Sequence, residues 1–338
     1  MEANTLIEEK GIVMACATSV HIAALPAQAA AAHAATRACL EWFQAVEACL
    51  TRFAPDSELS QLNRAAGTWF TASETLFAVT QAALAAAAAT DGLFDPTLLA
   101  QMTAAGYDRD YDLIAQQEVA TTSDVPQPTG GWRKIALDPP RHSIRLPIGV
   151  GLDFGGIAKG WAVDRALSQF CDPFPGAILS IGGDIALRGG PQADAPWPVG
   201  IYDPHRSVEG EPAQNIAVIT LGQGGIATSG ATRRWWRQQG EQRHHLIDPR
   251  TGQPADIWLA PRTDGRDAEL IAMVTALAPT AMQAEVAAKV ALLRGPDSKP
   301  TENEGAVMWV MGDGQVRQSA NFETYLANHG GGKLWRMH

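Results

Sequence analysis

Residues 152–164, with the sequence LDFGGIAKGWAVD, join a β-type run to a helix through two adjacent glycines. Asp153 ends the β-type run, and Lys159 lies in the first turn of the predicted helix. Paired glycines let the backbone approach a ligand closely, and the free N–H groups of a helix start favour an anion. Because Lys159 adds a positive charge, the segment indicates a site for an anion such as a phosphate. An ordinary strand-to-helix turn with a solvated lysine is the alternative that the segment alone leaves open.

Helical and strand patterns follow each other irregularly on both sides of this segment. Apolar spacing predicts long helices at 27–50, 73–90 and 279–294. Strands are predicted at 11–24, 243–249, 270–277 and 306–311, and a hairpin is predicted at 132–147 with its turn at 138–141. Short β-type runs between glycine turns occupy 176–229. Because there is no regular βαβ alternation, the pattern favours an α+β fold over a doubly wound sheet.

The composition excludes several classes of protein. Of 338 residues, 26 are Lys or Arg and 36 are Asp or Glu, so the formal net charge is −10, and no basic run stands out. An acidic chain of this kind argues against binding to nucleic acid or to an anionic membrane. No apolar stretch approaches the roughly 18 residues of a transmembrane segment.

The N-terminal segment and the cysteines bear on the compartment. Residues 1–10, MEANTLIEEK, lack the basic n-region and the apolar h-region of a secretory signal. The four cysteines form no Cys-x-x-Cys motif, which indicates buried free thiols. Both features predict a cytoplasmic protein.

Residues 244–252, HHLIDPRTG, combine a titratable base with an acid. Asp248 follows His245 by three residues. A histidine whose pKa lies near neutrality can act as a general base, whereas a structural histidine in a strand is the alternative. Residues 228–230, TSG, precede two arginines and form a second possible anion site. Rossmann, P-loop, nucleophile-elbow and HExxH motifs are all absent from the sequence.

Taken together and in this order, these segments resemble the ApbE family of FAD:protein FMN transferases. The resemblance covers about residues 11–294 and runs through Met14 and through 50–63, 92–97, 153–164, 182–184, 228–230, 245–254 and 278–285. It implies a single ApbE-like domain over residues 1–338, with mixed or antiparallel sheets and packed helices around a central FAD cleft. Sub-lobes at about 11–150 and 151–338 and an insertion loop at about 255–269 are further expectations.

The resemblance also implies an activity. Such enzymes transfer the FMN moiety of FAD to a Thr or Ser hydroxyl of a target flavoprotein, and AMP leaves. This phosphoryl transfer needs an activated hydroxyl, neutralised phosphate oxygens and a stabilised leaving group. Two alternatives stay open, which are a non-catalytic FAD-binding protein and an FAD pyrophosphatase that gives FMN and AMP.

Carried over position by position, the resemblance assigns roles to individual residues. His245 is the expected base, and Asp248 belongs to the same catalytic motif. The expected FAD-binding residues are Met14, Phe53, Leu93, Phe94, Asp95, Asp153, Lys159, Thr228 and Ile247.

The resemblance places Mg²⁺ near the pyrophosphate, bound by a backbone oxygen at Gly156 and by side chains of the late helix. Here that helix has Glu285 and, four residues later, Lys289, where the family pattern has Asp and Thr. Glu is an oxygen ligand for a hard cation, but a protonated lysine cannot ligate one. Either the Lys289 ammonium occupies the place of the metal, giving a metal-independent or inactive site, or the helix is shifted and a metal binds through other groups. The family's Met-Gly-Thr is also altered to MAC at residues 14–16.

Overall fold

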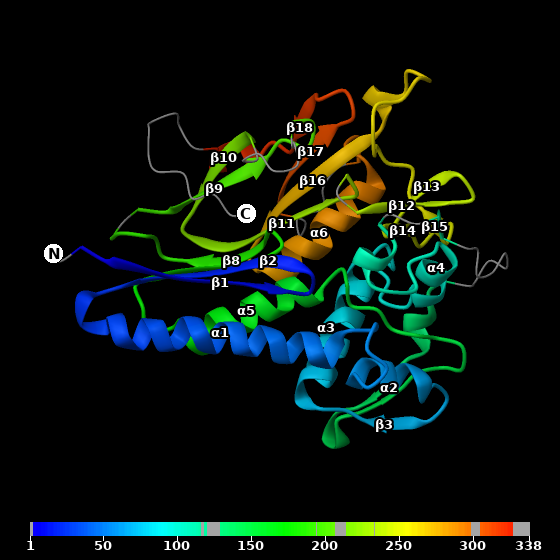
Figure 1. Ribbon diagram of the computed structural model, residues 1–338, viewed down its shortest axis with the longest axis horizontal. Coiled ribbons are helices and arrows are strands. Elements are labelled where there is room, and N and C mark those ends of the chain that lie inside the picture. The colour runs from blue at the N-terminus through cyan, green and yellow to red at the C-terminus, as the bar shows by residue number, and fades with distance from the viewer. Residues whose placement is uncertain are drawn as a thin grey trace.

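The computed structural model describes residues 3–115, 118–119, 129–193, 195–206, 214–232, 234–298 and 305–326 (Figure 1). Its central element is an eight-stranded sheet with the order β1-β2-β7-β8-β11-β16-β17-β18, in which all neighbours are antiparallel. These strands are β1 (Thr5–Val13), β2 (Cys16–Ala24), β7 (Gly176–Ile181), β8 (Asp184–Arg188), β11 (Gln223–Gly230), β16 (Ile271–Ala278), β17 (Ala306–Met311) and β18 (Val316–Gln318).

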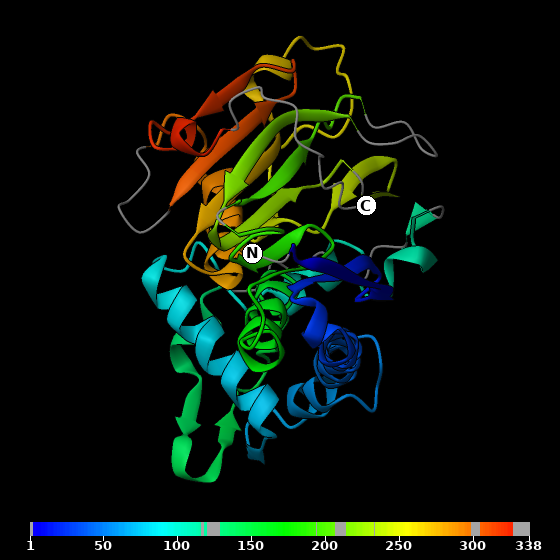
Figure 2. The same ribbon diagram turned by 90° about the vertical axis from the view of Figure 1, so that its left-hand side faces the viewer.

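Helices cover one face of this sheet. Helix α1 (Ala29–Leu50) packs on β1 and β2 and lies beside α5 (Ala158–Phe170), while α6 (Ala281–Arg294) packs on β11 and β16 (Figures 1 and 2). The remaining helices are α2 (Glu58–Arg64), α3 (Glu74–Ala89) and α4 (Leu99–Ala104). The 3-10 helices are Pro26–Gln28, Tyr111–Leu113, Gly131–Lys134, Pro139–Arg141, Asp267–Glu269 and Phe322–Tyr325.

Small sheets complete the architecture. Strands β9 (Trp197–Tyr202) and β10 (Asn215–Leu221) pair with each other, and their apolar residues share a buried cluster with the large sheet. A three-stranded sheet is formed by β3 (Trp69–Thr71), β6 (Ser143–Arg145) and β5 (Ala136–Asp138). The others are β13 (Glu241–His244), β12 (Trp235–Gln238) and β4 (Glu118–Val119), and the pair β14 (Ile247–Asp248) and β15 (Gln253–Pro254).

Close packing of α5 against α6 places the functional residues. A Cβ on Gly160 would lie 2.6 Å from the carbonyl oxygen of Ala281, so only glycine permits this approach. The Asp164 carboxylate accepts hydrogen bonds from the backbone N–H groups of Ala281 and Met282, each at 2.9 Å. Asp164 therefore caps α6 from outside, in addition to the N-cap Thr280, whose side chain accepts from the Gln283 N–H.

The α+β prediction is confirmed, and the three long predicted helices are present as α1, α3 and α6. Three details of the strand prediction are wrong. Residues 151–154 form no strand, and a turn at Met14 and Ala15 divides the predicted strand at 11–24 between β1 and β2. The predicted strand at 243–249 is divided into β13 and β14 by His245 and Leu246. Of the cysteines, Cys39 and Cys171 are buried free thiols as expected, whereas Cys16 and Cys49 are partly exposed free thiols. Within the described residues, none of the helices has the length and apolar character needed to cross a membrane.

Candidate functional site

The segment that precedes α5 is held by a side chain instead of by a strand partner. The Asn63 amide donates to the Leu152 carbonyl at 2.9 Å and accepts from the Leu152 N–H at 2.7 Å. Asp153 follows, and one of its carboxylate oxygens lies 2.6 Å from Nε of Arg52 while the other accepts from the Gly155 N–H at 2.8 Å. Asn63 thus fixes the backbone, and Arg52 fixes the carboxylate.

Arg52 packs against two aromatic rings, Phe53 and Tyr107, whose centroids are 5.6 Å apart. Its guanidinium carbon is 4.2 Å from the ring centroid of Phe53 and 4.6 Å from that of Tyr107, and Nη2 donates to the Tyr107 carbonyl at 2.7 Å. Tyr107 in turn stacks on Trp236 with centroids 5.3 Å apart. Phe53 is 36% exposed. The stack therefore presents an aromatic surface of the kind that binds a flat ring system.

Sequence reasoning missed Arg52 and Tyr107 as site residues. Arg52 lies inside the segment at 50–63 that carries the resemblance, so that segment was an available signal. Tyr107 has no comparable signal, because its role depends on contacts with Arg52 and Trp236 that are distant in the chain.

The Lys159 ammonium forms ion pairs with two carboxylates. Its ammonium pairs with Asp184 at the start of β8 and with Oε1 of Glu285 on α6, the latter at 2.5 Å. The second oxygen of Glu285 accepts from the Gly160 N–H at 2.8 Å. Burial lowers the pKa of Lys159, but the two carboxylates outweigh this effect and raise the pKa above its ordinary value. Burial raises the pKa of Glu285, and Lys159 opposes that shift.

Lys289 lies one helical turn beyond Glu285 and has different surroundings. Its Nζ is 5.7 Å from the ring centroid of Phe94 and 3.2 Å from the place that a Cβ on Gly156 would take. Among the described residues, no hydrogen bond or ion pair engages this half-buried ammonium. Burial lowers the pKa of Lys289, while the charges of Asp153, Glu285 and Asp95 raise it.

The adjacent residues His244 and His245 also differ from each other in their hydrogen bonds. Nε2 of His244 lies 2.9 Å from the Ala255 carbonyl oxygen, and Nδ1 accepts from the Leu246 N–H at 3.2 Å. Burial lowers the pKa of His244 to about 4. Nδ1 of His245 is buried and has no hydrogen-bond partner among the described residues. Burial, His244 and the charges of Arg234 and Lys289 hold the pKa of His245 well below its ordinary value. His245 is therefore a neutral imidazole with an unbonded nitrogen.

Asp248 is bound to Arg250 and not to His245. The guanidinium of Arg250 reaches the two Asp248 oxygens from Nε at 2.9 Å and from Nη2 at 2.7 Å, and Nη2 also donates to the Leu293 carbonyl at 2.7 Å. In the described part of the chain, no hydrogen bond or ion pair links Asp248 to His245. The carboxylate thus holds the β14–β15 turn against the end of α6.

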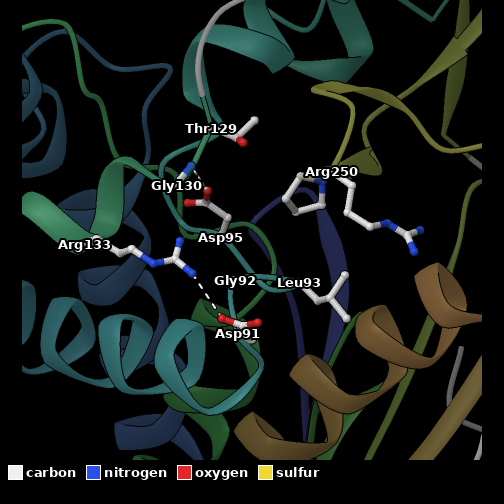
Figure 3. Close-up of a pocket in the computed structure, with 9 residues that line it drawn as sticks. Asp91, Gly92, Leu93, Asp95, Thr129, Gly130, Arg133 and Arg250 are labelled. Carbon is white, nitrogen blue, oxygen red and sulfur yellow. Dashed lines mark hydrogen bonds and ion pairs between the residues drawn. The ribbon is translucent and has the colours of Figure 1, made fainter.

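A pocket of about 210 Å³ opens beside this turn (Figure 3). It is lined by Asp91, Gly92, Leu93, Asp95, Thr129, Gly130, Arg133, Pro249 and Arg250. Figure 3 shows Arg133 and Arg250 on opposite sides of it. Both oxygens of Asp95 are engaged, because one accepts from the Thr97 N–H at 2.8 Å and the other from the Gly130 N–H at 2.7 Å. Asp95 therefore shapes the pocket wall.

The remaining expected site residues are Met14, Thr228 and Ile247. Met14 is in the β1–β2 turn, where Met14 and Ala15 have φ values of 54° and 52°. Arg234 donates to the Ala15 carbonyl at 3.0 Å. Thr228 on β11 shares a hydrogen bond of 2.9 Å with the Thr275 hydroxyl. Ile247 is buried in a small apolar cluster with residues of and beside α4.

The expected magnesium ligands do not form a magnesium site. Mg²⁺ requires several oxygen ligands in near-octahedral geometry. Both Glu285 oxygens and one Asp184 oxygen are engaged by Lys159 or Gly160, and Lys289 lies against Gly156. Over the described ranges, no group of three or more His, Cys, Asp or Glu residues is arranged to hold a metal ion. The donor set therefore does not fit the ion.

The chain is similar in sequence to known proteins of one family. The ApbE family model matches residues 14–304. An FAD:protein FMN transferase of Treponema pallidum is 31% identical over 261 residues, which are 71% of this chain and 70% of the relative. Another, of Salmonella typhimurium, is 27% identical over 293 residues, 82% of this chain and 78% of the relative.

Solved structures share the fold. The crystal structure of the ApbE protein from Thermotoga maritima has a TM-score of 0.78 at 23% identity and covers 96% of this chain and 100% of its own. The apo form of the flavinyl transferase ApbE from Pseudomonas stutzeri has a TM-score of 0.72 at 20% identity, with coverages of 96% and 98%. At these identities the two structures support the architecture alone.

Proposed function

The chain belongs to the ApbE family, and from this premise we propose that it transfers the FMN moiety of FAD to a Thr or Ser hydroxyl of a target flavoprotein and releases AMP. Relatives at 31% and 27% identity are named FAD:protein FMN transferase. The observation that carries the proposal is the state of His245. It is a neutral base with an unbonded nitrogen, and the cations Arg234 and Lys289 act on it. Transfer to a hydroxyl beside an anionic pyrophosphate needs this combination.

The acceptor hydroxyl oxygen attacks the phosphorus on the FMN side of the FAD pyrophosphate. A new P–O bond to the acceptor forms, the bond from that phosphorus to the bridging oxygen breaks, and AMP leaves with the bridging oxygen. The hydroxyl proton passes to Nδ1 of His245 and then to solvent. No oxidant or reductant is needed.

Other residues bind and orient FAD in this proposal. The surface formed by Arg52, Phe53 and Tyr107 stacks on a flat ring of FAD, because it combines aromatic faces with a fixed cation. The pocket beside Leu93 and Asp95 takes part of the nucleotide. The further proposed contacts with FAD are Met14, Phe94, Asp153, Thr228 and Ile247, whereas Lys159 is proposed to act on the site through its ion pairs with Asp184 and Glu285.

Asp248 is proposed as a positioning residue. Because its carboxylate is bound by Arg250, it acts by holding the turn that follows His245. Asp248→Asn would weaken that pairing, so it should lower the transfer rate by loosening the pocket wall while leaving the pH dependence of transfer unchanged. A shifted pH dependence would instead indicate a direct role beside the base.

The proposal is tested by AMP release from FAD with and without a Thr-containing acceptor domain. Acceptor-dependent AMP, together with covalent flavin on the acceptor by mass spectrometry, supports the transferase. AMP and free FMN without an acceptor would indicate the pyrophosphatase. Tight FAD binding without AMP under either condition would indicate a flavin-binding protein. In-gel flavin fluorescence of the host's proteins then identifies the acceptor.

We also propose that the chain works in a reducing compartment, as expected for the cytoplasm. All four cysteines are free thiols, and Cys16 and Cys49 are partly exposed. Cell fractionation followed by thiol labelling tests this proposal. Recovery of a disulfide-bonded form from an oxidising compartment would contradict it.

A further inference from the structure

We propose that this chain neutralises the FAD pyrophosphate with the ammonium of Lys289 and takes up no divalent cation for transfer. The inference rests on the proposed function, because it names what supplies positive charge at that site. It arises from the disagreement between the donor groups present and those that Mg²⁺ requires.

The carboxylates of the late helix and of β8 are unavailable to a metal. Lys159 bridges Asp184 and Glu285, and the second Glu285 oxygen accepts from the Gly160 N–H at 2.8 Å. A metal that bound Glu285 would have to break one of these contacts and then face the Lys159 ammonium 2.5 Å from the same carboxylate. The two like charges would repel each other in a poorly solvated site.

The Lys289 ammonium is free for a ligand. Among the described residues, no acceptor forms a hydrogen bond with Lys289, and its ammonium lies against Gly156 just before α5. The charges of Asp153, Glu285 and Asp95 raise the pKa of Lys289 without a direct ion pair, against the lowering effects of burial and of Lys159. An ammonium on a flexible stem carries three donors, which suits phosphate oxygens whose positions change during transfer.

The Gly156 backbone allows this arrangement. A Cβ at residue 156 would lie 3.2 Å from Nζ and 3.4 Å from the Phe94 ring, so a larger residue would push Lys289 away. The glycine at this position therefore leaves room for a lysine beside the turn. In the transfer step Lys289 keeps its protons and neutralises charge, while the bonds that form and break are those of the proposed reaction.

The first test measures metal binding directly and needs no turnover. Mn²⁺ serves as the probe, and its free concentration is followed by electron paramagnetic resonance with the protein, with protein plus FAD, and with FAD alone. The inference expects no Mn²⁺ bound beyond the FAD-alone control. About one Mn²⁺ bound per chain, with or without FAD, would overturn it.

The second test separates the role of Lys289 from the folding of the protein. Lys289→Ala should weaken FAD binding about 10-fold or more but leave riboflavin binding unchanged, because riboflavin lacks the pyrophosphate. Lys289→Arg, which keeps the charge, should retain most of the FAD affinity. The surface variant Lys10→Ala is the matched control. Equal loss of FAD and riboflavin affinity in Lys289→Ala would overturn the inference.

The third test uses turnover. Transfer by the wild-type chain should change less than about 2-fold between excess EDTA and excess Mg²⁺, whereas Lys289→Ala should lose about 100-fold in both. The double variant Glu285→Asp with Lys289→Thr should gain both Mn²⁺ binding and Mg²⁺ dependence. Loss of wild-type transfer in EDTA and its recovery with Mg²⁺ would overturn the inference. A chain that binds FAD through Lys289 but never transfers would refute the proposed function and leave the charge assignment standing.

Discussion

Two groups of residues in this molecule use the same types of side chain in opposite ways. In the first, Lys159 bridges two carboxylates, and both ring nitrogens of His244 are hydrogen-bonded. In the second, Lys289 and His245 have the same chemistry but lack partners at their functional nitrogens within the described structure. We call the first the bonded region and the second the open region.

This difference distinguishes polar residues that stabilise the fold from polar residues that are available to bind a ligand. Buried polar groups are normally paired, and an unpaired one costs stability. In the bonded region, the ion pairs of Lys159 offset the cost of burying its charge, and they connect α5 to β8 and α6. The open region retains unpaired groups that a bound pyrophosphate and an acceptor hydroxyl would complete.

The largest expected effect comes from breaking the bonded region. Lys159→Met leaves two buried carboxylates without their cation, so we expect the free energy of unfolding to fall by about 3–5 kcal/mol. Urea denaturation measures the change. Lys289→Met is the matched control, and it should cost less than about 1 kcal/mol because no ion pair is lost. Equal losses in the two variants would remove the distinction between the regions.

The next effect concerns His245, the proposed base of the open region. His245→Ala should slow transfer by about 10²–10⁴-fold while FAD affinity changes little. Since the pKa of His245 is held below its ordinary value, the base stays deprotonated at mildly acidic pH, and the wild-type rate should fall only well below pH 6.5. Stopped assays of AMP release across pH provide the check. If His245→Ala abolished FAD binding without a separate effect on rate, His245 would not be the base.

A smaller effect tests the partner histidine. His244 has a folded-state pKa of about 4 against an ordinary value of 6.5, so the unfolded chain takes up a proton that the folded chain does not. The contribution of His244 to the free energy of unfolding is therefore complete above pH 6.5. It decreases by about 3 kcal/mol in total as the pH falls toward 4. Urea unfolding of the wild type and of His244→Gln at pH 7 and pH 4.5 measures it. The variant should lose this part of the pH dependence and keep its transfer rate per folded molecule.

The smallest effect lies in the β1–β2 turn that Arg234 contacts. Ala15 has a φ of 52°, which is unfavourable for a residue with a Cβ. Ala15→Gly should stabilise the chain by up to about 1 kcal/mol. The matched change Ala17→Gly, at an exposed position of β2, should destabilise it instead. Calorimetric Tm values distinguish the two, and a lower Tm for Ala15→Gly would show that the turn carries no such strain.

The sequence was sufficient for much of the architecture. Apolar spacing and capping residues such as Ser73 and Thr280 lie within single segments, so the long helices could be predicted from local patterns. The strand expected before Asp153 failed because a side chain, Asn63, satisfies that backbone from 89 residues away. Local sequence also does not reveal the partner of Asp248. Its neighbour in the sequence motif is His245, but its partner in the structure is Arg250.

By itself, the sequence determined the α+β class, the long helices, the family and the segments that form the candidate site, because these depend on residue types and their spacing along the chain. Only the tertiary structure decided which charged groups form ion pairs within the fold and which remain free. Lys159 meets Asp184 and Glu285 across 25 and 126 residues of chain, and that meeting depends on the packing of α5, α6 and β8. Electrostatic interactions depend on distance in space and on burial, so two lysines that are alike in sequence become a structural ion pair and a free ammonium.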